Sequence, residues 1–236
     1  MQTPDFALPP APHFAPADLL FLFEHFPAPG VDAVAAVQRV HEQPLWLERI
    51  LDSRYVLEAL QDRRQLLLSV SPQLFFDVAL RHSLDPLAAS RSPVERLTIH
   101  YLAHLLALFI RSERWHQASP DDPERYAYLA DLMQAAQQAE LSRRFLYDAH
   151  LANYALCCSG LFARWMTHRR VYHRRPVSIE YYRRLGRTHF GLAASHGLAA
   201  RYQLHEVFRH LEARFEYFRD GLDRLAQRFL PQAAAA

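Results

Sequence analysis

The 236-residue sequence predicts an all-α fold, a single-domain bundle of about eight or nine helices. Apolar residues recur at helical spacing in nearly every segment after residue 16, and no stretch alternates convincingly with a period of two. Three segments begin with a capping residue followed by proline: Ser71-Pro72, Ser92-Pro93 and Asp122-Pro123. At such a start the side-chain oxygen accepts a hydrogen bond from a free backbone N–H, and the proline loses no bond.

The elements follow in order along the chain. Residues 1–16 contain five prolines and are expected to form an extended or disordered lead-in. A helical domain is expected over 17–230, and a disordered tail over 231–236. The apolar spacing predicts helices at 16–26, 31–42, 45–68, 72–83, 93–115, 123–139, 141–172, 179–195 and 200–229.

Breaks between these helices are marked by particular residues. The stretch 45–68 is expected to be interrupted. Pro176 should end the 141–172 pattern, and Ser178 should cap the next helix. Gly197 is a break before the last helix.

The last helix carries the most regular apolar stripe, with a strict 4-3 spacing at Leu204, Phe208, Leu211, Phe215, Phe218, Leu222, Leu225 and Phe229. Such a stripe packs either inside a bundle or against a second chain. Three bulky phenylalanines in its middle favour a broad groove inside the bundle. A homodimer through residues 204–229 is the alternative. The helices at 93–115, 141–172 and 200–229 are expected to form the core.

Composition narrows the class of protein. Half of the residues are apolar and 12% are aromatic, which excludes disorder for most of the chain. The most apolar run, 97–110, is shorter than the roughly 20 residues that a bilayer requires. The N-terminus lacks the basic start and apolar stretch of a signal peptide. Cys157 and Cys158 are neighbours in a helical stretch, where a disulfide is rare, and no CxxC occurs. We therefore expect a cytoplasmic protein of bacterial type, with no membrane partner.

Charge is divided unevenly along the chain. Residues 1–140 carry 18 acids and 11 arginines, whereas 141–236 carry 16 arginines and 7 acids. Within 164–187 there are eight arginines and a single acid, Glu180. All 27 basic side chains are arginine, which indicates either selection for forked donors or the codon usage of a GC-rich genome. The excess of alanine and leucine favours codon usage.

The basic segment is the candidate surface for a polyanion. Its arginines are interleaved with tyrosines at 172, 181 and 182, and guanidinium groups bind phosphate while rings stack on bases. Three alternatives remain for these arginines. They could complement the dipole at a helix C-terminus, they could simply reflect the arginine-rich composition, or they could pair with acids of the first half of the chain. The candidates for binding an acidic partner are Arg169, Arg170, Arg174, Arg175, Arg183, Arg184 and Arg187.

Histidine spacings do not predict a metal site. His100 and His104 lie four apart on one helix, the spacing at which two imidazoles share a metal. Arg96 and Arg111 lie on the same stripe and would repel a cation, which favours a solvated or polar-packed face. A third ligand and a supporting carboxylate cannot be named from the sequence. Glycine-rich phosphate loops are also absent, so no cofactor is predicted.

His150, Asn153 and Cys157 share one face of the predicted 141–172 helix and are the pocket candidates. Buried polar groups need hydrogen-bond partners, because each unsatisfied group costs about 1–3 kcal/mol. One interpretation is a structural pair that fixes helix packing. The other is a ligand pocket or a titrating site, since an imidazole exchanges protons near neutral pH.

Residues 150–162, HLANYALCCSGLF, resemble an uncharacterised family of bacterial all-helical cytoplasmic proteins, whose members read approximately H-V-G-D-x-A-L-x-x-x-G-x-F. Residues 181–190 resemble the later Y-Y-x-x-x-G-x-x-A-Y segment of that family. The resemblance implies a helical cytoplasmic protein and supplies no activity. The chain has Asn153 where the family usually has aspartate, and an amide cannot act as a carboxylate base or an anionic metal ligand.

The sequence therefore predicts a non-catalytic interaction or regulatory module, with a basic Arg/Tyr face for an acidic protein or polyanion. The alternative is a helical protein that binds a small molecule or a metal in a pocket around His150, with enzymatic activity left open.

Overall fold

The computed structural model describes residues 3–7, 14–27, 37, 44–62, 70–84, 91–120, 122, 125–126, 129–164, 166 and 178–229. Within these residues the regular elements are eleven α-helices and one 3-10 helix, with no strand, which confirms the all-α class. None of the helices in the described part of the chain has both the length and the apolar character needed to cross a membrane. Most of the predicted helix at 31–42 and the tail at 231–236 lie outside the described residues.

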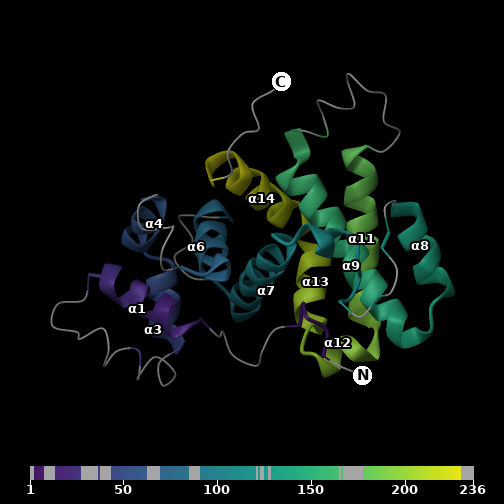
Figure 1. Ribbon diagram of the computed structural model, residues 1–236, viewed down its shortest axis with the longest axis horizontal. Helices are drawn as coiled ribbons and strands as arrows, with labels where there is room; N and C mark the ends of the chain where they lie inside the picture. The colour runs from purple at the N-terminus through teal and green to yellow at the C-terminus, as the bar shows by residue number, and fades with distance from the viewer. Residues whose placement is uncertain are drawn as a thin grey trace.

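The helices fall into a smaller N-terminal group and a larger group that holds the rest of the chain (Figure 1). The first group contains α1 (Pro16–His25), α3 (Pro44–Leu51), α4 (Arg54–Gln61) and α6 (Pro72–Leu84). The second contains α7 (Pro93–Phe109), η2 (Ser112–Trp115), α8 (Leu129–Gln138), α9 (Leu141–Leu161), α11 (Ile179–Ser195), α12 (Gly197–Arg201), α13 (His205–Ala213) and α14 (Phe215–Phe229).

The larger core forms where α7, α9, α11, α13 and α14 meet. Phe208 lies near its centre, with ring centroids 5.6 Å from Tyr101, 6.2 Å from Phe145 and 5.7 Å from Phe190. All four rings are fully buried, and rings at these separations interact favourably beyond their buried area. These residues tie three long helices to α13.

A smaller core lies beneath α1, α3 and α4. Helix α6 belongs to both cores, because Leu74 and Val78 pack in the smaller one while Leu80 and Leu84 pack in the larger one. Phe229, at the end of α14, also contacts both. Helix α6 therefore lies between the two cores and packs against both.

The regular stripe of the predicted last helix is used inside the chain. Its residues from Leu204 to Leu225 are each at most 1% exposed, which confirms intramolecular packing and leaves this stripe unavailable for the homodimer considered at 204–229. The single helix predicted over 200–229 was wrong, because it divides into α12, α13 and α14. Gln203 has a left-handed φ of 58° between the first two, and α13 ends before Arg214.

Serine caps occur where the sequence predicted them. The hydroxyls of Ser71, Ser92 and Ser178 each accept the backbone N–H three residues on, at 3.2 Å. The helix start predicted at Asp122 was wrong, because α8 begins at Leu129 and the described residues just before it are not helical. The backbone N–H of Tyr126 instead donates to the carbonyl of His116 at 2.8 Å. That hydrogen bond holds the segment before α8 against the end of η2.

The helix predicted over 93–115 ends early, and the one predicted over 141–172 is interrupted. Helix α7 stops at Phe109, whose carbonyl accepts a hydrogen bond from the indole N–H of Trp115 at 2.8 Å. Helix α9 stops at Leu161, and the chain turns at Phe162, whose ring lies 5.6 Å from Trp115. Ala163, Arg164 and Met166 are helical again, so the predicted 141–172 helix is interrupted at Phe162. Trp115 therefore contacts the chain at both points, at the Phe109 carbonyl and at the Phe162 ring.

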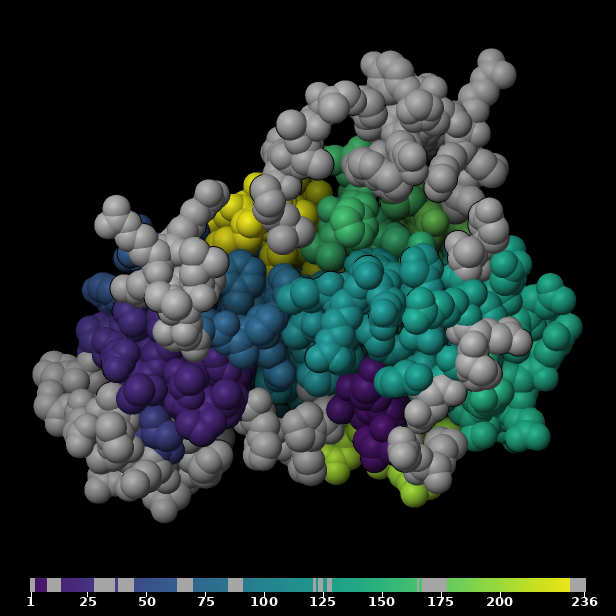
Figure 2. Space-filling model, in the orientation of Figure 1, coloured from purple at the N-terminus to yellow at the C-terminus, as the bar shows by residue number. Residues whose placement is uncertain are grey.

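Residues 3–7 differ from the extended or disordered lead-in predicted for 1–16. Phe6 is 3% exposed and lies 6.2 Å from Phe145, and Asp5 accepts a hydrogen bond from Arg114 at 2.8 Å. The backbone carbonyl of Asp5 also lies 2.7 Å from Nε2 of His104. Figure 2 shows these first residues, in dark purple, against the teal surface of the larger group. Burial of one aromatic side chain outweighs the proline-rich composition here.

Candidate functional site

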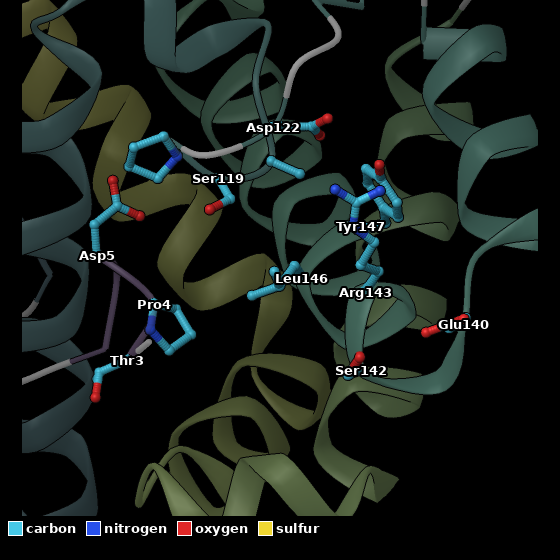
Figure 3. Close-up of a pocket in the computed structure, with 12 residues that line it drawn as sticks. Thr3, Pro4, Asp5, Ser119, Asp122, Glu140, Ser142, Arg143, Leu146 and Tyr147 are labelled. Atoms are coloured by element: carbon cyan, nitrogen blue, oxygen red, sulfur yellow. The ribbon is translucent and has the colours of Figure 1, made fainter. Parts of the chain in front are cut away.

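A pocket of about 510 Å³ lies between residues 3–5, the loop after η2 and the start of α9 (Figure 3). Its charged lining residues are Asp5, Asp122, Glu140 and Arg143. Figure 3 shows Asp5 and Glu140 on opposite sides, with Arg143 and Tyr147 between them. The pocket therefore brings together segments that are more than 100 residues apart in the sequence.

The chemistry of this pocket suits binding through hydrogen bonds. The Tyr147 hydroxyl lies 3.0 Å from that of Tyr126, and burial raises the pKa of Tyr147, so the phenol stays protonated at neutral pH. Asp5 already pairs with Arg114, while Arg143 is exposed. The lining holds three carboxylates and one guanidinium, and Arg114, bound to Asp5, adds a second cation beside it.

His150, predicted as a pocket residue, is buried in α9. It is 3% exposed, its Nε2 lies 3.3 Å from the carbonyl of Trp115, and its ring meets Phe109 edge-on at 6.0 Å. Burial, together with the nearby charge of Arg114, lowers the pKa of His150 to about 4. At neutral pH the imidazole is uncharged and donates to a backbone carbonyl, which is a packing role.

Asn153 and Cys157 also have the environment of packing residues. The amide of Asn153 lies 2.7 Å through Nδ2 and 3.0 Å through Oδ1 from the hydroxyl of Tyr101, and both side chains are nearly inaccessible. Cys157 is fully buried, and burial raises the pKa of its thiol well above the ordinary value. Because the thiolate is the reactive form of cysteine, this position disfavours reactivity. The pocket in Figure 3 is lined by other residues.

Of the candidate arginines in the basic segment, the three that the structure describes lie on α11, whereas Arg164, also described and exposed, follows α9. Arg183 pairs with Glu180 and Glu216, each at 2.8 Å, and its hydrogen bond to Glu216 raises its pKa. Both acids come from the second half of the chain, so Arg183 does not pair with the acidic first half. Arg184 and Arg187 are exposed. The remaining candidates lie outside the described residues: Arg169, Arg170, Arg174 and Arg175.

The tyrosines of α11 face its neighbours. The Tyr181 hydroxyl donates to the sulfur of Met133 at 3.2 Å, and the Tyr182 ring lies 6.4 Å from that of Tyr154. Both tyrosines are half-buried. Tyr172 lies outside the described residues.

A buried charge cluster between α3, α6 and α7 was not predicted from the sequence. Arg81, 2% exposed, contacts Asp77 at 2.6 Å and Glu48 at 2.8 Å. The other oxygen of Asp77 lies 2.9 Å from Nδ1 of His100. Burial alone would raise the pKa of Asp77, but the attraction of Arg81 and His100 lowers it below its usual value. The i, i+4 spacing of Asp77 and Arg81 was the only local signal.

This cluster explains the predicted histidine stripe. His100 is 3% exposed, and the half-buried His104 lies 3.4 Å through Nδ1 from Oε1 of Gln73. The stripe is therefore a polar-packed face against α6. Within the described residues, no three His, Cys, Asp or Glu side chains are grouped so that they could hold a metal ion.

No protein-family model, curated protein or solved structure matches the chain. The resemblance at residues 150–162 and 181–190 therefore stays a prediction from the sequence.

Proposed function

We propose that the chain is a non-catalytic interaction module that binds an acidic partner through the arginines of α11. The observation that carries the proposal is the exposure of Arg184 and Arg187 on a helix whose inner side is firmly packed. These arginines belong to the stretch 164–187, which holds eight arginines and one acid. Such an excess raises the local concentration of an anionic partner and its rate of association.

The packing of α11 supports a preformed surface. At Gly186 an added Cβ would come within 2.4 Å of the buried Phe215 ring, so α11 and α14 approach closely there. Arg183, one turn before Arg187, is bound to Glu216 of α14. A surface held by such contacts loses less conformational entropy when it binds than a flexible one does.

The side chains that could act as an acid, a base or a nucleophile support the non-catalytic part of the proposal. His150 and Cys157 are the titratable candidates of α9, and both are buried in their uncharged forms at neutral pH. Catalysis by either would need access to a substrate and a pKa near the working pH.

The test compares two double variants with the same change in charge. Arg184→Ala/Arg187→Ala removes the exposed arginines of α11. Arg49→Ala/Arg54→Ala, the control, removes two exposed arginines from α3 and α4 at the other end of the molecule. Binding of labelled polyglutamate, polyphosphate and oligothymidylate is followed by fluorescence anisotropy at low and at physiological ionic strength.

We expect at least one acidic polymer to bind at low ionic strength and to be released by salt. Two exposed charge contacts contribute about 0.2–1 kcal/mol each. The α11 variant should therefore bind about two- to thirtyfold more weakly, and the control should bind like the wild type. Absence of binding to all three polymers, or equal weakening in both variants, would contradict the proposal.

A further inference from the structure

Five aromatic side chains form a connected strip from η2 to the start of α11. Successive ring centroids are 5.6 Å apart from Phe162 to Trp115, 5.7 Å from Trp115 to Tyr154, and 6.4 Å from Tyr154 to Tyr182. Tyr181 continues the strip at 6.0 Å from Tyr182. We call these five residues the aromatic strip.

The aromatic strip lies at the surface, unlike the phenylalanines of the core. Phe162 is 40% exposed, and the other four rings are half-buried. The indole N–H of Trp115 donates inward to the Phe109 carbonyl, and the Tyr181 hydroxyl donates to Met133. These two polar groups are therefore used inside the protein.

Exposed arginines accompany the strip. Arg111 immediately precedes η2, which carries Trp115, and Arg164 follows Phe162 by two residues. Arg184 follows Tyr181 by three residues, so the two side chains lie on the same face of α11. A purely charged polymer such as polyglutamate would use these guanidinium groups and have no need of the rings. A single-stranded nucleic acid uses both, since its phosphates bind arginine and its unpaired bases stack on aromatic side chains. In duplex DNA the bases are already stacked on one another, so contacts are chiefly to phosphate.

We propose that the acidic partner is a single-stranded nucleic acid whose bases stack on the aromatic strip while its phosphates contact the arginines beside it. This inference rests on the proposed function and specifies its partner. The contact is independent of base sequence, because every base has a ring face on which an aromatic side chain stacks.

The experiment separates the contribution of the bases from that of the charge. Labelled oligothymidylate of about 12 nucleotides, within the range of single-strand binding sites, is compared with an abasic strand of equal length and charge. Polyglutamate is the third probe. Two single variants are measured with each probe: Phe162→Leu removes a ring but keeps an apolar side chain, and Leu192→Ala is the control. Leu192 is 44% exposed on α11, close to the exposure of Phe162.

We expect the abasic strand to bind at least about fivefold more weakly than oligothymidylate, since one stacked base contributes about 1 kcal/mol or more. Phe162→Leu should weaken oligothymidylate binding by a similar factor and leave abasic binding unchanged. Leu192→Ala should change neither. Circular dichroism and the thermal midpoint of each variant check that the fold is retained.

The outcomes distinguish the two proposals. Equal binding of both strands, weakened alike by Arg184→Ala/Arg187→Ala, would overturn the aromatic strip as a base-binding surface and leave the acidic-partner proposal standing. Binding of polyglutamate alone would have the same consequence. Failure of these three probes and of polyphosphate at low ionic strength would overturn both.

Discussion

His150 provides a quantitative test of the interpretation that α9 is a packing helix. Its imidazole is 3% exposed with Nε2 3.3 Å from the Trp115 carbonyl, and burial lowers its pKa to about 4. In the unfolded chain the pKa of histidine returns to about 6.5. Between these values the unfolded state binds more protons than the folded state. The stability that this group contributes is therefore complete above about pH 6.5 and is lost as the pH falls toward 4.

The two pKa values set the size of the effect. Between pH 7 and pH 5, linkage removes about 2 kcal/mol of unfolding free energy through this one group. His150→Gln keeps an N–H donor for the Trp115 carbonyl but does not titrate. We therefore expect its unfolding free energy to fall by about 2 kcal/mol less than that of the wild type over the same interval.

The measurement is urea denaturation, followed by circular dichroism at several pH values between 7 and 5. His205→Gln, which removes a half-exposed imidazole of α13 and retains His150, is the control and should keep the pH dependence that His150 contributes. Equal losses in the wild type and in His150→Gln would refute the buried, uncharged state of His150.

Two further substitutions test the packing. In Gly160→Ala the new Cβ would lie 2.7 Å from Cβ of Leu222, and we expect overpacking of about 3 kcal/mol to exceed the gain in helix propensity of about 1 kcal/mol. A net loss of about 2 kcal/mol in urea denaturation is expected, whereas Gly197→Ala, with no atom within 4 Å of its new Cβ, should change stability by less than about 0.5 kcal/mol. Similar values for the two glycines would show that α9 and α14 are not in close contact. Arg81→Met leaves the buried carboxylate of Asp77 without its cation, and thermal denaturation should report a loss of about 3–5 kcal/mol. A loss below about 1 kcal/mol would contradict the burial of this ion pair.

Features that depend on a few neighbouring residues were predictable. Ser71, Ser92 and Ser178 cap helices because each hydroxyl reaches a backbone N–H three residues on, whatever the rest of the fold does. The break at Gln203 was not predictable, because it depends on a left-handed backbone that glycine or asparagine usually adopts. The chain is held there by the N–H of Leu204 donating to a carbonyl of α12 at 2.8 Å.

The candidate sites divide in the same way. The sequence placed His150 and Asn153 on one face of a central helix, and both are buried on α9. Their partners, Trp115 and Tyr101, come from segments 35 and 52 residues away, which no local pattern reports. The pocket in Figure 3 was not predicted for the same reason, because Asp5 lines it together with residues more than 100 positions away.

The position of α6 has a consequence for how the protein unfolds. With Leu74 and Val78 on one side and Leu80 and Leu84 on the other, the helix cannot leave one core without opening the second. Its buried Arg81 connects it to α3 as well. The N-terminal helices therefore should not open as a separate foldon, and native-state hydrogen exchange should find the slowest amides of α6 and α7 released in one shared cooperative event.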